Sequence, residues 1–248
     1  MAFLKSYLFL IVVRMLFIWF IALSTATFSA FWAAEIHGHF DALQRLKREF
    51  GYNPIDHQIL YLGDYIDRGP NSYKVVKEVM RDVLEGAIAL LGNHDRIMIN
   101  ALREPNRNRI NDTLLWLRNG GQKTLDSYKN RKGAMKNHLE FLATLPLYVE
   151  SDKYFFVHAG VNPTRKIKDQ TEEDFLWIRE EFLNASDLSR ATSKIVIFGH
   201  SPTIAFTGKA EIFIAEDRIG VDTGAGFNKR LSAFDTQSQC CYSVEVGS

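Results

Sequence analysis

Short apolar runs alternate with amphipathic stretches along the first part of this chain. Residues 31–36, 58–62 and 87–91 are short, nearly continuous apolar runs, which are typical of buried parallel strands. Between them, residues 40–50 and 72–84 carry apolar side chains at helical spacing, with charged side chains on the opposite face. This alternation predicts parallel strand–helix–strand units.

The later part of the chain predicts further elements of the same domain. Residues 103–112 are polar and rich in Asn, and we expect a loop or cap segment there. Residues 138–145 predict a helix, residues 154–157 and 195–198 predict strands, and residues 210–246 predict short antiparallel strands. No internal repeat or second domain is evident, so residues 29–248 are expected to form one α/β domain.

Residues 1–28 form a separate apolar segment that allows three interpretations. Its stretch from residue 7 to 23 is apolar except for Arg14. A signal peptide would use Lys5 as its basic region and residues 24–26 as a cleavage site. A membrane anchor would place Arg14 near mid-span, at a cost of roughly 2.5–3.5 kcal/mol. An extraneous upstream start would leave a cytoplasmic protein, whereas the first two predict export or membrane contact.

Composition restricts the partners that we expect. The 248 residues suffice for one sizeable buried core, and their net charge of +1 gives no basic field for a nucleic acid. The two cysteines, Cys240 and Cys241, are adjacent and imply no disulfide framework, which fits a reducing compartment. We expect a cytoplasmic monomer that binds no nucleic acid.

Five short polar motifs occur along the chain, each just after an apolar run. The motifs supply carboxylates, an amide oxygen and imidazoles, a ligand set that suits paired divalent cations. Parallel strands place such motifs at one edge of a sheet. The five motifs are Glu35-Ile36-His37-Gly38, Gly63-Asp64-Tyr65-Ile66-Asp67-Arg68-Gly69, Gly92-Asn93-His94-Asp95, His158-Ala159-Gly160 and Gly199-His200.

With these motifs the chain resembles the bacterial phosphoprotein (serine/threonine) phosphatases of the calcineurin-like metallophosphoesterase superfamily. The resemblance runs from about residue 36 to 234 and extends to flanking phrases at residues 62–70, 119–125, 175–179 and 219–224. It implies an α/β fold in which a β-sandwich of mixed sheets is flanked by helices.

The resemblance also implies a pair of divalent ions, manganese foremost and iron or zinc as alternatives. Two ions about 3.5–4 Å apart would activate a water molecule and bind the phosphoryl oxygens. Asp64 matches the ligand that the two ions share. The implied metal ligands are Glu35, His37, Asp64, Asn93, His158 and His200.

Further residues match positions that act on the substrate. By resemblance, His94 is the general acid that protonates the leaving group, and Asp67 orients its ring. Arg68 and Arg179 match two phosphate-binding arginines, and Asn93 also faces the phosphate.

Four polar residues near or between the motifs have other expected roles. We expect Asp95 to be a structural partner of an arginine or a backbone amide. His39, His57 and His138 match no ligand position and are expected on the surface.

Glu35 departs from the pattern of the resembled family. The family's first motif reads Gly-Asp-x-His-Gly, whereas this chain has Ala34-Glu35-Ile36-His37-Gly38. Glutamate reaches one methylene farther, and a site needs its ligands within about 0.5 Å of productive geometry. The protein is therefore fully active, impaired at its first metal, or a relative that only binds phosphate.

Three functions follow from these residues. The first is a metal-dependent serine/threonine phosphatase acting on a phosphoprotein or a small phosphoester, which residues 64–68 and 177–181 favour. The second is a symmetrical dinucleoside-polyphosphate hydrolase, an activity of a sister family with nearly the same motifs. The third is a phosphate-binding protein without turnover.

Overall fold

The computed structural model describes residues 29–33, 35–103 and 107–247. The alternatives for the apolar N-terminal segment lie outside these residues. Among the helices that the structure describes, none combines the length and the apolar character needed to cross a membrane.

One five-stranded sheet carries the first three predicted strands. β1 and β2 are parallel, as are β2 and β3, whereas β9 and β10 extend the sheet as antiparallel strands. The predicted parallel units are confirmed, although the third strand is shorter than expected. The sheet has the order β10-β9-β1-β2-β3, with β1 (Ser29–Ala33), β2 (His57–Tyr61), β3 (Ile88–Ala89), β9 (Arg230–Asp235) and β10 (Cys241–Glu245).

A second five-stranded sheet holds the strands that deliver the later motifs. β5 and β6 are parallel, β6 and β8 are parallel, and β4 and β7 form antiparallel edges. The expected antiparallel tail is thus confirmed for β7 with β8 and for β9 with β10. The order is β4-β5-β6-β8-β7, with β4 (Tyr148–Glu150), β5 (Tyr154–Val157), β6 (Ile195–Phe198), β7 (Phe213–Ile214) and β8 (Arg218–Gly220).

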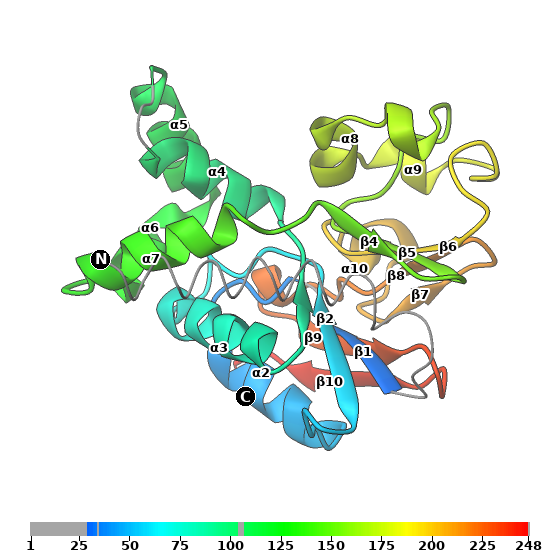
Figure 1. Ribbon diagram of the computed structural model, residues 1–248, viewed down its shortest axis with the longest axis horizontal. Helices are drawn as coiled ribbons and strands as arrows, with labels where there is room; N and C mark the ends of the chain where they lie inside the picture. The colour runs from blue at the N-terminus through cyan, green and yellow to red at the C-terminus, as the bar shows by residue number, and fades with distance from the viewer. Residues whose placement is uncertain (1–28, 34, 104–106, 248) are drawn as a thin grey trace.

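The two sheets pack face to face and enclose an apolar core (Figure 1). Leu60 of β2 and Leu90, which directly follows β3, form one buried cluster with Phe156, Ile197 and Ile219 of the second sheet. These side chains are buried because alternate residues of each strand point toward the facing sheet. The expected sandwich of mixed sheets is confirmed.

Helices cover the outer faces of the sandwich (Figure 1). α2 (Phe40–Glu49) and α3 (Ser72–Leu84) bury the apolar stripes that the sequence shows, including Leu43, Leu46 and Val79, against the first sheet. The second sheet is covered through residues such as Phe175 and Phe182. They lie on two of the short helices that follow its strands, α8 (Glu172–Trp177), α9 (Glu180–Leu183) and α10 (Thr203–Thr207).

A group of helices follows the third motif and extends beyond the sandwich (Figure 1). Residues 103–112 were expected to form a loop or cap segment, and the loop alternative is wrong for the second part because α5 begins at Arg109. The buried Trp116 anchors this helix despite its polar composition, so tertiary packing overrides the local sequence. The group consists of α4 (Asn93–Leu102), α5 (Arg109–Trp116), a π-helical turn (Leu117–Gly121), α6 (Gln122–Ser127) and α7 (Lys132–Leu142).

The histidines expected on the surface are more enclosed than predicted. His138 is buried, which contradicts the prediction: its ring stacks on Tyr73 and its Nδ1 lies 2.7 Å from the hydroxyl of Tyr128. Helix packing supplies two aromatic partners that are distant in sequence. His39 and His57 are partly buried.

Candidate metal centre

The loops that leave β1, β2, β3, β5 and β6 meet at one end of the sandwich. They deliver side chains from all five motifs, and most of these side chains are almost fully buried. Backbone hydrogen bonds join the loops, from His37 N–H to the Asp64 carbonyl at 2.9 Å and from Gly199 N–H to the His158 carbonyl at 2.8 Å. The motifs that the sequence predicted to converge therefore lie together.

The backbone of this region is unusually strained. Non-glycine residues rarely adopt positive φ, and such residues concentrate at functional sites when the surrounding structure holds them. Nine of the described non-glycine residues have positive φ, and six belong to the motifs. These six are Glu35, His37, Asp64, Asp67, Arg68 and His200.

Gly92 allows the second and third motifs to approach each other closely. A Cβ at this position would collide with the backbone and carboxylate of Asp64. The backbone N–H of His94 can therefore donate to Asp64 Oδ1 at 2.9 Å. Asp95 accepts hydrogen bonds from the backbone N–H groups of Asp64 and Gly92 at 2.9 and 3.1 Å, which confirms its expected structural role.

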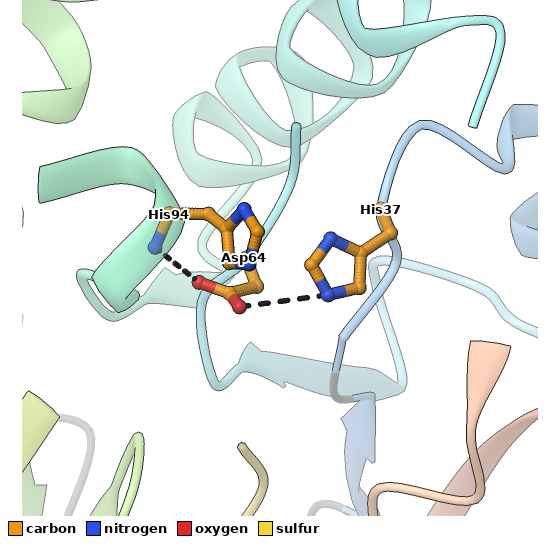
Figure 2. Close-up of side chains that lie close together, drawn as sticks. All are labelled: His37, Asp64 and His94. Atoms are coloured by element: carbon orange, nitrogen blue, oxygen red, sulfur yellow. Dashed lines mark hydrogen bonds and ion pairs between the residues drawn. The ribbon is translucent and has the colours of Figure 1, made fainter. Parts of the chain in front are cut away.

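Asp64 lies at the centre of the site, and Figure 2 shows its carboxylate between His37 and His94. Its Oδ2 is 3.5 Å from Nε2 of His37. Two groups of ligand atoms, each within 4.8 Å of one another, contain Asp64: one with His37 and His94, the other with Glu35 and His158. One carboxylate is thus shared by two adjacent clusters, as a pair of cations requires.

Glu35 reaches across both clusters. Its Oε1 accepts a hydrogen bond from the backbone N–H of His200 at 2.8 Å and lies 3.3 Å from Nδ1 of His158. Its Oε2 lies 3.5 Å from Nε2 of His37. This predicted metal ligand therefore has one carboxylate oxygen near each cluster.

The second cluster presents ligand atoms with suitable orientation. His158 places Nδ1 2.8 Å from the Leu62 carbonyl, which leaves Nε2 facing Asn93 Oδ1 at 3.0 Å and Asp64 Oδ1 at 3.6 Å. Nε2 of His200 is buried and has no hydrogen-bond partner among the described residues. A buried imidazole nitrogen without a partner fits a metal ligand, and the oxygen and nitrogen donor set fits divalent cations.

Burial and mutual proximity shift the pKa values of these groups. Burial lowers the pKa of His158, and burial together with neighbouring cationic groups lowers the pKa of His37 and His200. Burial raises the pKa of Glu35, and the adjacent Asp64 carboxylate raises it further. Burial acts to raise the pKa of Asp64 as well, but the surrounding imidazoles outweigh it and lower that pKa. Neutral imidazoles beside an ionised carboxylate are the forms that bind metal.

His94 and Asp67 form a buried pair beside the two clusters. Nδ1 of His94 lies 2.8 Å from Asp67 Oδ2. The other oxygen of Asp67 accepts hydrogen bonds from Trp116 Nε1 at 2.9 Å and from Thr124 Oγ1 at 2.7 Å. Because these donors fix the carboxylate, the His94 ring is held with Nδ1 toward Asp67 and Nε2 toward the site.

The two predicted arginines approach different parts of the site. Arg68 directs one terminal nitrogen to His37 Nε2 at 3.1 Å and the other to His94 Nε2 at 2.9 Å. Arg179 donates to the backbone carbonyl of His200 at 2.9 Å and to Ser201 Oγ at 3.1 Å. Both guanidinium groups therefore lie beside the expected metal ligands.

Asp222 is a site carboxylate that the sequence analysis did not single out. It is buried shortly after β8, and its Oδ1 accepts a hydrogen bond from the Gly224 N–H at 2.9 Å. Burial, partly offset by that hydrogen bond, raises its pKa to about 6, and Asp64 contributes.

Comparison with known proteins agrees with this geometry. Over 131 residues the chain is 28% identical to a symmetrical bis(5'-nucleosyl)-tetraphosphatase of Actinobacillus pleuropneumoniae, covering 52% of this chain but only 44% of that protein. It is 25% identical to the asymmetrical bis(5'-nucleosyl)-tetraphosphatase PrpE of Oceanobacillus iheyensis, covering 81% of this chain and 85% of that one.

A solved structure shows the same fold. The crystal structure of a provisionally assigned diadenosine tetraphosphatase superimposes with a TM-score of 0.64 at 21% identity, covering 90% of this chain and 96% of that one. The family model described as calcineurin-like phosphoesterase matches residues 33–225. This match covers most of the chain, which therefore belongs to the calcineurin-like phosphoesterase family.

Proposed function

We propose that this protein hydrolyses dinucleoside tetraphosphates in a reaction that depends on a pair of divalent cations. The observation that carries the proposal is that Asp64 belongs to both ligand clusters. Family membership supports metal-dependent phosphoester hydrolysis, and the names of the relatives favour dinucleoside tetraphosphates over phosphoproteins.

The ligand clusters define which residues would hold the cations. The cations would activate water and neutralise charge on the phosphate groups. Asp64 would be shared, and Glu35 has an oxygen facing each cluster. The proposed ligands are Glu35, His37, Asp64, Asn93, His158 and His200.

His94 is the proposed general acid. Asp67 accepts a hydrogen bond from Nδ1 of His94, so a proton delivered to the leaving group must come from Nε2 of the same ring. Nε2 lies 2.9 Å from a terminal nitrogen of Arg68, so both groups face the same volume. Asp67, fixed by Trp116 and Thr124, is the positioning residue for this proton transfer.

Two arginines and an amide are the proposed phosphate ligands. Arg68 and Arg179 are planar donors that suit bidentate binding of phosphate oxygens. Arg68 contacts His37 and His94 of the first cluster, whereas Arg179 contacts the backbone carbonyl of His200. A phosphate chain would therefore lie between them, with Asn93 facing it at the second cluster.

A serine/threonine phosphatase is the second candidate function. It rests on the sequence phrase at residues 177–181, whose Arg179 is brought to the site. Hydrolysis of phosphoserine or phosphothreonine in a protein has the side-chain alkoxide as its leaving group, whereas a dinucleoside tetraphosphate releases a nucleotide. The two candidates therefore differ in the substrate that is cleaved fastest.

A substrate panel decides between these candidates. Manganese-loaded protein is given diadenosine tetraphosphate, a phosphoserine peptide and glycerol phosphate, and kcat/KM is measured for each. The proposal predicts the highest value for diadenosine tetraphosphate. Chromatography then shows whether the products are two ADP or AMP with ATP. Preference for the peptide would favour the phosphatase, and binding without turnover of any substrate would indicate an inactive relative.

A further inference from the structure

We propose that Phe227 is a stacking platform for a nucleobase at the edge of the metal centre. This inference rests on the proposed dinucleoside tetraphosphatase function and assigns a residue that determines its substrate class. Neither the motifs nor the metal-binding geometry requires an aromatic ring at this position. Its location and exposure therefore need a separate explanation.

The Phe227 ring is exposed next to a proposed phosphate ligand. It is 57% exposed, although large aromatic rings are usually more enclosed. The guanidinium carbon of Arg68 lies 4.8 Å from the ring centroid. The terminal nitrogens of Arg68 contact His37 and His94. One arginine side chain thus links the ring to the centre of the site.

The turn that carries Phe227 is fixed in place from within. It is a 3₁₀ turn (Ala225–Phe227) between Gly224 and Asn228, which both have left-handed φ values. Phe227 N–H donates to the Gly224 carbonyl at 2.9 Å, and Asn228 N–H donates to the Ala225 carbonyl at 3.0 Å. Asp222 accepts a hydrogen bond from the Gly224 N–H at the start of the turn. The ring therefore projects from a short, hydrogen-bonded loop.

The same turn is pressed against the metal centre. A Cβ on Gly226 would collide with the side chains of His37 and Arg68. Because the turn is positioned by residues of the first two motifs, the ring is preorganised relative to the site, which lowers the entropy cost of binding.

The chemistry of the ring and its neighbour favours a nucleotide. Arg68 suits a phosphate oxygen, whereas the exposed ring suits a flat aromatic group by stacking. A nucleotide carries both groups on one ribose. An aliphatic side chain of a phosphopeptide would gain only apolar contact. Replacement of Phe227 by leucine therefore distinguishes a nucleobase, which would lose its stacking partner, from an aliphatic side chain, which would keep its apolar contact.

Two pairs of probes test the inference. ADP and pyrophosphate share a diphosphate but differ by adenosine, and each is measured as an inhibitor of 4-nitrophenyl phosphate hydrolysis by the manganese-loaded protein. Diadenosine tetraphosphate and inorganic tetraphosphate form the matching substrate pair. The variants are Phe227→Ala, Phe227→Leu and Phe227→Tyr, with Ile55→Ala as a remote exposed control.

We expect Phe227→Ala and Phe227→Leu to raise the inhibition constant of ADP by about 5- to 150-fold relative to that of pyrophosphate, the range expected for loss of one base stack. Phe227→Tyr and Ile55→Ala should keep the ratio of the two constants. The ratio of kcat/KM for diadenosine tetraphosphate over inorganic tetraphosphate should fall in the same two variants.

Three results would overturn the inference. Equal inhibition constants for ADP and pyrophosphate in the unmodified protein would show that adenosine contributes nothing. A parallel rise for both inhibitors would mean that the ring only supports Arg68. Recovery of the ratio by leucine would indicate simple apolar contact. Cleavage of diadenosine tetraphosphate by the unmodified protein is measured as a separate experiment. Its result tests the proposed function, whereas the inhibition constants of the variants test the role of Phe227.

Discussion

The carboxylate of Glu35 accepts a hydrogen bond from the backbone N–H of His200 at 2.8 Å, joining two loops that are 165 residues apart in sequence. The two loops follow strands of different sheets, so this contact connects the halves of the sandwich at the metal centre. The glutamate that departs from the family pattern makes this bond with its Oε1. Glu35 therefore takes part in the hydrogen bonding that joins the loops of the site.

Shortening Glu35 should destabilise the metal-free protein, whereas neutralising it should not. Glu35→Asp should lower the free energy of unfolding by about 1–3 kcal/mol, because the buried His200 N–H loses its acceptor. Glu35→Gln keeps an acceptor of the same length and removes the charge that faces Asp64, so it should not lower stability. Urea unfolding of both variants in chelator measures these changes.

Metal titration separates the same two variants. Glu35→Gln should bind manganese more weakly than the unmodified protein, since an anionic ligand is lost. Glu35→Asp retains the charge and serves as the matched control. If Glu35→Asp is as stable as the unmodified protein and binds manganese more tightly, the chain tolerates the family's shorter side chain and the bond to His200 is dispensable.

Replacing His94 should affect substrates according to their leaving groups. His94→Asn should reduce kcat by roughly 10²- to 10⁴-fold for a phosphoserine peptide, whose alkoxide must be protonated. The loss should be smaller for 4-nitrophenyl phosphate, whose leaving group is a weaker base. Metal content should stay near normal, which elemental analysis checks. An equal loss for both substrates would show that His94 positions the substrate.

Trp116 and Thr124 illustrate what the sequence could not predict. The loops of the centre were predictable because Gly, Asp and His follow apolar runs directly. Trp116 and Thr124 reach Asp67 from 49 and 57 residues away, and no local pattern signals that convergence. The placement of one Glu35 oxygen near each cluster is likewise a property of the folded loops. Tertiary packing also explains why α5 replaces part of an expected loop.

The buried His138 should make stability dependent on pH. Burial lowers its pKa to about 4, whereas in the unfolded chain it titrates near 6.5. Between these values only the unfolded state binds the proton, so stability falls as pH drops from about 6.5 to 4, by on the order of 2 kcal/mol. Urea unfolding of the unmodified protein and of His138→Gln across this range measures the effect.

The variant removes the titrating group, so the difference in unfolding free energy between the two proteins should shrink as pH falls. His138 packs between Tyr73 and Tyr128, outside the proposed ligands, which keeps this test independent of metal binding. Parallel stability curves for the two proteins would show that His138 is not held neutral in the folded state.

The shared position of Asp64 is tested most directly by following diadenosine tetraphosphate with and without metal. Chelated protein, manganese-reconstituted protein and reconstituted Asp64→Asn are incubated with the dinucleotide, and released nucleotides are separated by anion-exchange chromatography. The two-cation account predicts nucleotide products from the reconstituted unmodified protein alone, because both clusters lose an anionic ligand in the variant. Release of the same products at the same rate by chelated protein or by Asp64→Asn would contradict it.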